Sequence, residues 1–141
     1  MHKRFLQTAS LLGALSVILG AFAAHTLKKH ISEAAVQIFE TAVRYQFYHV
    51  FALLSVGVLY KEFPNKLLRW SGISFTAGII IFCGSLYCLT YIKAAELTAF
   101  DWVGAITPLG GLSFILGWIF LFSATAKKPI KSHKSLEVLN V

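Results

Sequence analysis

The sequence predicts an all-α, polytopic membrane protein with four transmembrane helices. Hydrophobic residues make up 57% of the 141-residue chain, charged residues only 13%, and the mean hydropathy is +0.69. Soluble domains carry about 25% charged residues, so this low charge density indicates lipid as the solvent. Four long apolar stretches lie between clusters of charge, at about 5–24, 43–60, 70–92 and 102–122. Their apolar residues do not alternate with period two, which argues against barrel strands.

Three of these stretches are long enough to cross a membrane, because a helix of about 20 apolar residues covers a hydrocarbon core of about 30 Å. They are residues 5–24, 70–92 and 102–122. The first follows the basic start MHKR and imitates a secretory signal, but its apolar run is longer than a typical signal core. We therefore expect a permanent span. Trp70 and Trp102 open the other two, and Trp118 closes the last, as interfacial aromatic residues do.

The second span is short unless it extends backwards. Residues 47–60 would rise only about 21 Å as a helix. The sequence KEFPNK stops the helix after Tyr60, so a full span must begin near Thr41, within the stretch FETAVRYQFYH (39–49). That start brings Arg44 near the outer interface and places His49 inside the membrane.

An outer, interfacial amphipathic helix is predicted between spans one and two, continuing into span two. Ser32 is a suitable N-cap for it. Apolar residues then recur at three- and four-residue steps, at Val36, Phe39, Val43 and Phe47. Glu40 and Arg44 are four residues apart in the order that favours an ion pair.

The basic residues predict the orientation of the chain. Nine lie on the side of both termini: Lys3, Arg4, Lys61, Lys66, Arg69, Lys127, Lys128, Lys131 and Lys134. Four lie on the other side: Lys28, Lys29, Arg44 and Lys93. The positive-inside rule then makes this a multi-pass protein of the bacterial inner membrane with cytoplasmic N- and C-termini. Most of the net charge of +7 lies on the cytoplasmic rim, which favours anionic lipid over nucleic acid as its partner.

Small residues at helical spacing predict close helix packing. The glycines concerned are Gly13 and Gly20 in span one and Gly110 and Gly117 in span four. Such residues let helix backbones approach closely in lipid. A single four-helix bundle cannot use the glycine-rich faces of spans one and four for all of its internal contacts, so we expect a homo-oligomer. In span four Pro108 predicts a kink, where the Thr107 hydroxyl helps to satisfy the freed backbone.

Polar residues near the outer side form a candidate site. Its members are His25, Glu40, Arg44, Tyr45, Gln46, His49, Asp101 and Thr107. Tyr45 and Gln46 are four and three residues before His49, so the three share one helix face. Ionisable groups at membrane depth are functional candidates by default.

Three interpretations of this polar cluster stay open. The first is an interhelical network that fixes helix packing in a structural or accessory membrane component. The second is a small-solute or proton carrier or channel with its site at His49, and the third is metal or haem held by His25 and His49. A buried, water-filled cavity reaching His49 would favour a carrier, and a fully paired cluster a structural role. The sequence contains no HExxH motif, serine–histidine–acid constellation or paired carboxylates within a span, so we expect no enzyme and assign no cofactor.

Four short motifs resemble a known family: GAFAAH (20–25), FETAVRYQFYH (39–49), GSLY (84–87) and GAITPLGG (104–111). They look like the signatures of the YgdD/YwdK family of small bacterial inner-membrane proteins, a domain-of-unknown-function family, over about residues 5–124. The resemblance implies a four-span inner-membrane protein and supplies no activity, ligand or partner. We expect one transmembrane domain, residues 1–124, and a basic cytoplasmic tail, residues 125–141.

Overall fold

The computed structural model describes residues 1–126, apart from the side chains of residues 98, 99 and 101. Its helices are α1 (Lys3–His25), η1 (Leu27–Lys29), α2 (Glu33–Leu59), α3 (Lys66–Gly78), η2 (Ile79–Cys83), α4 (Gly84–Ala94), η3 (Thr98–Ile106) and α5 (Thr107–Thr125). Within this part, four helical stretches are long and apolar enough to cross a membrane: Lys3–Lys29, Glu33–Leu59, Lys66–Ala94 and Trp102–Thr125. The predicted four-span, all-α fold is confirmed. From residue 127, the predicted basic tail lies outside the described residues.

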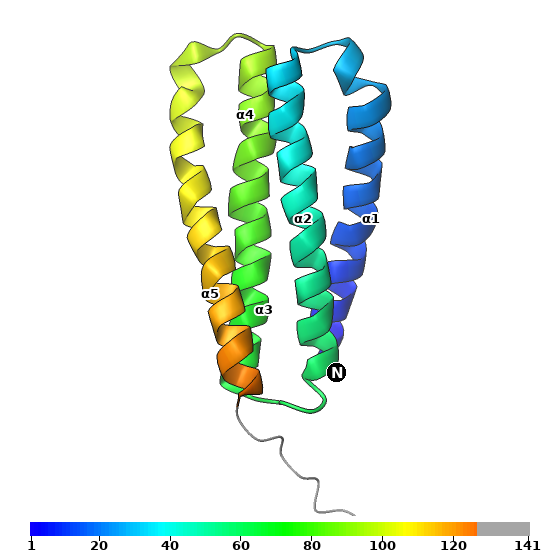
Figure 1. The fold of residues 1–141 in the computed structure, drawn as a ribbon, viewed down its shortest axis with the longest axis vertical. Helices are drawn as coiled ribbons and strands as arrows, with labels where there is room; N and C mark the ends of the chain where they lie inside the picture. The colour runs from blue at the N-terminus through cyan, green and yellow to red at the C-terminus, as the bar shows by residue number, and fades with distance from the viewer. Residues whose placement is uncertain (127–141) are drawn as a thin grey trace, which may run out of the picture.

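The four spans pack as an antiparallel bundle of two helix pairs (Figure 1). α1 pairs with α2, and α5 pairs with the long helix formed by α3, η2 and α4. The two pairs meet where α2 packs against that long helix. The N-terminus, the α2–α3 loop and the end of α5 lie at the same end of the bundle, as four consecutive spans require.

α2 is one unbroken helix that includes the whole stretch FETAVRYQFYH. Ser32 caps its start, where the side-chain oxygen accepts a hydrogen bond from the Ala35 N–H at 3.3 Å. The helix has 27 residues and is about 40 Å long, which exceeds the thickness of a hydrocarbon core. The predicted extension of span two back beyond Thr41 is confirmed, and the interfacial helix forms the first turns of α2.

The third span contains a π-helical turn at its centre. Asn65 caps the start of α3 by accepting a hydrogen bond from the Leu68 N–H at 2.9 Å. The α-helix then gives way to the π-helix η2 before α4 begins at Gly84. A π turn inserts an extra residue and so rotates the faces of the helix that follows. The sequence predicted a regular helix here, because IIIFC contains no local signal for the change.

The fourth span changes helix type just before Pro108. Residues 98–106 form the 3-10 helix η3, and Pro108 lies in the first turn of α5. A proline there loses no intrahelical hydrogen bond, because the N–H groups of a first turn have no partner inside the helix. Instead of the predicted kink within a continuous α-helix, the structure has a junction between a 3-10 helix and an α-helix.

Glycines let α5 approach the third span closely. A Cβ atom on Gly110 would lie 2.4 Å from the backbone nitrogen of Phe82, within the π turn. A Cβ atom on Gly117 would lie 2.6 Å from the ring of Phe75. The glycine face of span four is therefore occupied within the chain.

The glycines of α1 face α2 with more room. A Cβ atom on Gly13 would lie 3.4 Å from the Val50 side chain, and one on Gly20 would lie 3.7 Å from Val43. Both distances are close to ordinary van der Waals contact, so these positions do not demand glycine. The two contacts also define the register of the pair, with residue 13 level with residue 50 and residue 20 level with residue 43.

Candidate functional site

Two polar residues of α2 point into the bundle. The side chain of Gln46 is 2% exposed and that of His49 is 6% exposed. They are three residues apart, so they lie on the same face of the helix. A polar group in hydrocarbon is costly unless it is hydrogen-bonded, so each of these side chains needs partners on neighbouring helices.

Gln46 joins three spans. Its amide nitrogen donates a hydrogen bond of 3.1 Å to the carbonyl oxygen of Leu12 on α1. Its amide oxygen accepts a hydrogen bond of 2.9 Å from the hydroxyl of Tyr87 on α4. The Leu12 carbonyl also accepts a hydrogen bond from the Ser16 hydroxyl at 2.8 Å, within α1. Both ends of the buried amide are therefore satisfied by the protein.

His49 has both ring nitrogens within hydrogen-bond distance of protein atoms. Nδ1 lies 2.8 Å from the carbonyl oxygen of Tyr45, and Nε2 lies 3.4 Å from Nε1 of Trp118 on α5. The indole N–H can only donate, so Nε2 of His49 accepts that hydrogen bond. Nδ1 therefore carries the hydrogen and donates it in a hydrogen bond to the backbone carbonyl of Tyr45. This pattern of donors and acceptors fits a single neutral tautomer.

Aromatic rings enclose the imidazole of His49. The ring of Phe114 stacks on it, with centroids 3.5 Å apart and ring planes 8° from parallel. The rings of Phe75 and Tyr45 lie 5.8 and 6.1 Å away. Phe82, in the π turn, contacts Tyr45 and Phe114 at centroid distances of 4.8 and 5.5 Å. The enclosure therefore includes side chains from α2, α3, η2 and α5.

Hydroxyl groups tie the third span to the last part of the chain. The pairs are Ser71 with the Gly117 carbonyl (2.8 Å), Ser113 with the Ser74 carbonyl (2.9 Å) and Ser85 with Thr107 (2.8 Å). Thr107 was expected to satisfy backbone groups freed by Pro108, but its partner is the hydroxyl of Ser85. These hydrogen bonds add polar contacts between α5 and the third span, which Gly110 and Gly117 of α5 already approach closely.

The expected outer polar cluster does not form as one unit. Glu40 pairs with Lys28 at 3.0 Å, and not with Arg44 as expected, because η1 folds back against α2. Arg44 is exposed, and no described acidic side chain lies within 4.0 Å of it. Asp101, another member of the expected cluster, has a side chain outside the described part of the chain. His25 is exposed at the end of α1.

His25 and His49 are not brought together. Because Gly13 contacts Val50, His49 is level with about residue 14 of α1, some eleven residues from His25. At 1.5 Å per residue, the two imidazoles are roughly 16 Å apart along the bundle, which is too far for one shared metal ion or haem iron. Among the described residues, no group of three or more histidine, cysteine or acidic side chains is placed to hold a metal.

Sequence reasoning missed the partners of Gln46 and His49. Trp118 was assigned to a membrane interface, whereas its indole lies beside His49, with ring centroids 6.3 Å apart. Tyr87 belongs to the motif GSLY, but nothing in that motif points to Gln46. A signal did exist, because a buried glutamine or histidine needs donors and acceptors, and tyrosine and tryptophan can supply donors. Choosing among the aromatic residues required the register of the helices.

Four membrane-length helices held together by buried side-chain hydrogen bonds define a polytopic, helical integral membrane protein. The chain belongs to the family described as "Protein of unknown function (DUF423)", whose model matches residues 19–111. The resemblance carried by its four motifs is therefore confirmed.

The chain is similar to UPF0382 membrane proteins from several bacteria. It is 42% identical to one from Staphylococcus aureus (strain bovine RF122 / ET3-1), over 89% of this chain and 97% of the relative. It is 36% identical to YwdK of Bacillus subtilis, over 89% and 98%, and 37% identical to a relative from Haemophilus influenzae, over 86% and 92%. These names state a membrane protein and no activity. No solved structure was found to match the chain.

Proposed function

We propose that the protein is a structural or accessory component of the membrane and not an enzyme. One observation supports this most directly: the polar atoms of Gln46 and His49 are already engaged by Leu12, Tyr87, Tyr45 and Trp118. A carrier must offer polar atoms that a solute can occupy and leave. Here a solute would first have to displace partners within the chain.

The buried hydrogen bonds favour one arrangement of the helices more than they add stability. Interhelical bonds in membranes contribute on average about 0.6 kcal/mol each. Gln46 reaches Leu12 and Tyr87 only when α1, α2 and α4 hold one register, and any slip leaves a buried amide unpaired, at a cost of about 1–3 kcal/mol. The proposal is therefore a rigid bundle whose faces toward lipid or toward another protein are held in fixed positions.

A small-solute or proton carrier with its site at His49 is the second candidate. The π turn η2 favours it, because π turns in α-helices occur frequently at functional sites. Phe82, in that turn, touches Tyr45 and Phe114, and both of those rings lie against His49. A movement of the π turn would therefore shift the two aromatic rings that lie against the imidazole of His49.

Proton flux separates the two candidates. The purified full chain is placed in liposomes containing a pH-sensitive dye, and a pH gradient and membrane potential are imposed. For a structural protein we expect no flux above that of empty liposomes, and we expect His49→Gln to lower the free energy of unfolding by about 1 kcal/mol. The matched control is Tyr48→Phe, beside His49 but exposed. Flux through the wild type that His49→Gln abolishes without loss of stability would overturn the structural role.

The proposed location is the bacterial inner membrane with both termini in the cytoplasm. It is supported by basic residues gathered at the end of the bundle where the chain begins: Lys3, Arg4, Lys61, Lys66 and Arg69. Positive charge favours the cytoplasmic side. We also propose self-association through α1, which buries a much smaller share of its length than α2 does.

A further inference from the structure

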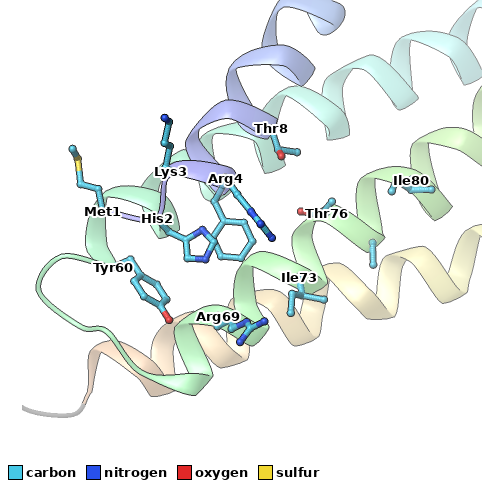
Figure 2. A pocket seen from close by; sticks show the side chains of 12 residues that line it. Met1, His2, Lys3, Arg4, Thr8, Tyr60, Arg69, Ile73, Thr76 and Ile80 are labelled. Atoms are coloured by element: carbon cyan, nitrogen blue, oxygen red, sulfur yellow. The ribbon is translucent and has the colours of Figure 1, made fainter.

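A cavity of about 770 Å³ opens between α1 and α3 at the end of the bundle where the chain begins (Figure 2). Three basic side chains line it: Lys3 and Arg4 from α1 and Arg69 from α3. Figure 2 shows Arg4 extending from α1 toward α3, where Arg69 lies near the start of the helix. The cavity is thus bordered by cations from two separate spans.

These cations have no carboxylate partner within the described chain. Among the side chains that the structure describes, no acidic one lines the cavity, and none approaches Lys3, Arg4 or Arg69 within 4.0 Å. The first turn of α1 adds to the positive field, because its N-cap, His2, makes no side-chain capping bond and the turn's N–H groups have no partner inside the helix. Together these groups favour an anion at the mouth of the cavity.

The wall of the cavity formed by the third span is mostly apolar beyond Arg69, and Thr76 is its one polar member among the lining residues. Ile73, Ala77 and Ile80 recur at steps of four and three residues after Arg69, so they lie below it in one row. From Arg69 to Ile80 the helix rises about 16 Å, which is close to half of a hydrocarbon core of about 30 Å. Phe5 of α1 borders the same cavity and packs over Gly72. The row therefore has the length of one leaflet.

We propose that this cavity binds one anionic glycerophospholipid, with its phosphate between Arg4 and Arg69 and one acyl chain along Ile73, Ala77 and Ile80. A basic mouth followed by an apolar row of leaflet length matches the order of charge and hydrocarbon in such a lipid. The guanidinium groups provide the forked donors that phosphate oxygens accept. Neutral phosphatidylcholine presents a choline cation to the same mouth and binds less well.

Native mass spectrometry of the full chain in detergent tests the site, with phosphatidylglycerol and phosphatidylcholine of identical acyl chains offered together. We expect one retained phosphatidylglycerol per chain, favoured about tenfold or more, since basic side chains attract anionic lipid strongly. Arg4→Gln combined with Arg69→Gln should remove that preference. The matched control is Lys66→Gln combined with Arg44→Gln, which loses the same charge at exposed positions that do not line this cavity.

A variant of the apolar row and three contrary results complete the test of the lipid site. Ile80→Gln, at a 67% exposed position, should weaken retention while keeping every cation. Equal retention of the two lipids by the wild type overturns the proposal, and this result does not depend on any variant folding. An equal loss in the Lys66/Arg44 control shows diffuse charge attraction and also overturns it. Displacement of the lipid by soluble glycerol 3-phosphate shows a phosphate site without a lipid and contradicts the acyl-chain part.

Discussion

The phenol of Tyr87 on α4 donates a hydrogen bond of 2.9 Å to the amide oxygen of Gln46 on α2. The amide nitrogen of the same glutamine donates to the Leu12 carbonyl on α1. One side chain therefore connects three of the four spans. Because Gln46 is almost fully buried, water cannot replace a partner that is lost.

Removing the hydroxyl of Tyr87 should destabilise the bundle. We expect Tyr87→Phe to lower the free energy of unfolding by about 1 kcal/mol, because it leaves the amide oxygen of Gln46 buried and unpaired. Unfolding in mixed detergent micelles with increasing sodium dodecyl sulfate measures the change. Tyr91→Phe, on the same helix but 70% exposed, is the control and should have no effect.

A double-mutant cycle tests whether the two residues act together. The double variant Gln46→Leu, Tyr87→Phe should lose less free energy of unfolding than the two single variants added together, by about 0.5 kcal/mol or more. Each single change leaves the other partner of the hydrogen bond buried and unpaired, whereas the double change removes both partners. Strict additivity would mean that the Tyr87–Gln46 bond does not contribute to stability.

The close approach of Gly110 to the backbone of Phe82 predicts that a side chain at residue 110 is strongly destabilising. Gly110→Ala should destabilise the protein by about 1–3 kcal/mol, because its Cβ would meet the backbone of Phe82, which cannot rotate aside. Gly84→Ala is the matched control, since nothing lies within 4 Å of its Cβ position. That change should raise stability by up to about 1 kcal/mol, as alanine favours a helix interior. Thermal unfolding of both variants in one detergent provides the comparison.

The proposed orientation predicts which loops a reagent can reach. In a background with Cys83 and Cys88 replaced by alanine, Lys66→Cys should react with a membrane-impermeant maleimide only after the cytoplasmic side is opened. Glu33→Cys, at the start of α2, should react in intact cells. Both positions are exposed in the structure, so burial does not protect either one. Labelling of Lys66→Cys from outside intact cells would show that this loop lies outside and would contradict the proposed orientation.

Self-association should depend on α1 and not on the glycines of α5. Ala14 and Ala21 are exposed and seven residues apart, so they give α1 a narrow outward face that a second copy can approach. Ala14→Leu with Ala21→Leu should increase the monomer fraction in cross-linking, whereas Leu112→Met on α5 should not. A wild type that is purely monomeric in lipid nanodiscs removes this part of the proposal.

The fold was largely predictable because the length of an apolar stretch is a local property of the sequence. The continuity of α2 was also predictable, since Ser32 provides a cap and the apolar stripe leads from it into span two. The π turn and the 3-10 helix η3 were not predictable. The π turn lies where Phe82 meets the backbone of Gly110, and that contact joins residues from different spans.

The site was predictable only in part. The shortage of apolar length in span two already predicted that His49 belongs to the span, and it lies within α2 and is buried in the bundle. Its partner Trp118 is 69 residues further along the chain, and the donor to Gln46 is 41 residues away, so helix register chooses both. For Glu40 the helical i, i+4 rule favoured Arg44, but the folding of η1 places Lys28 closer.

α2 is the least apolar of the four spans, and its inward face carries Gln46 and His49. A helix enters the bilayer from the insertion machinery according to its own apolarity, so α2 is the span least suited to enter alone. During synthesis α1 is already complete when α2 emerges, and its Leu12 carbonyl offers the first acceptor for the amide of Gln46. We therefore expect α1 and α2 to enter the membrane as one hairpin. Tyr87 is synthesised later, and its arrival satisfies the other end of that amide.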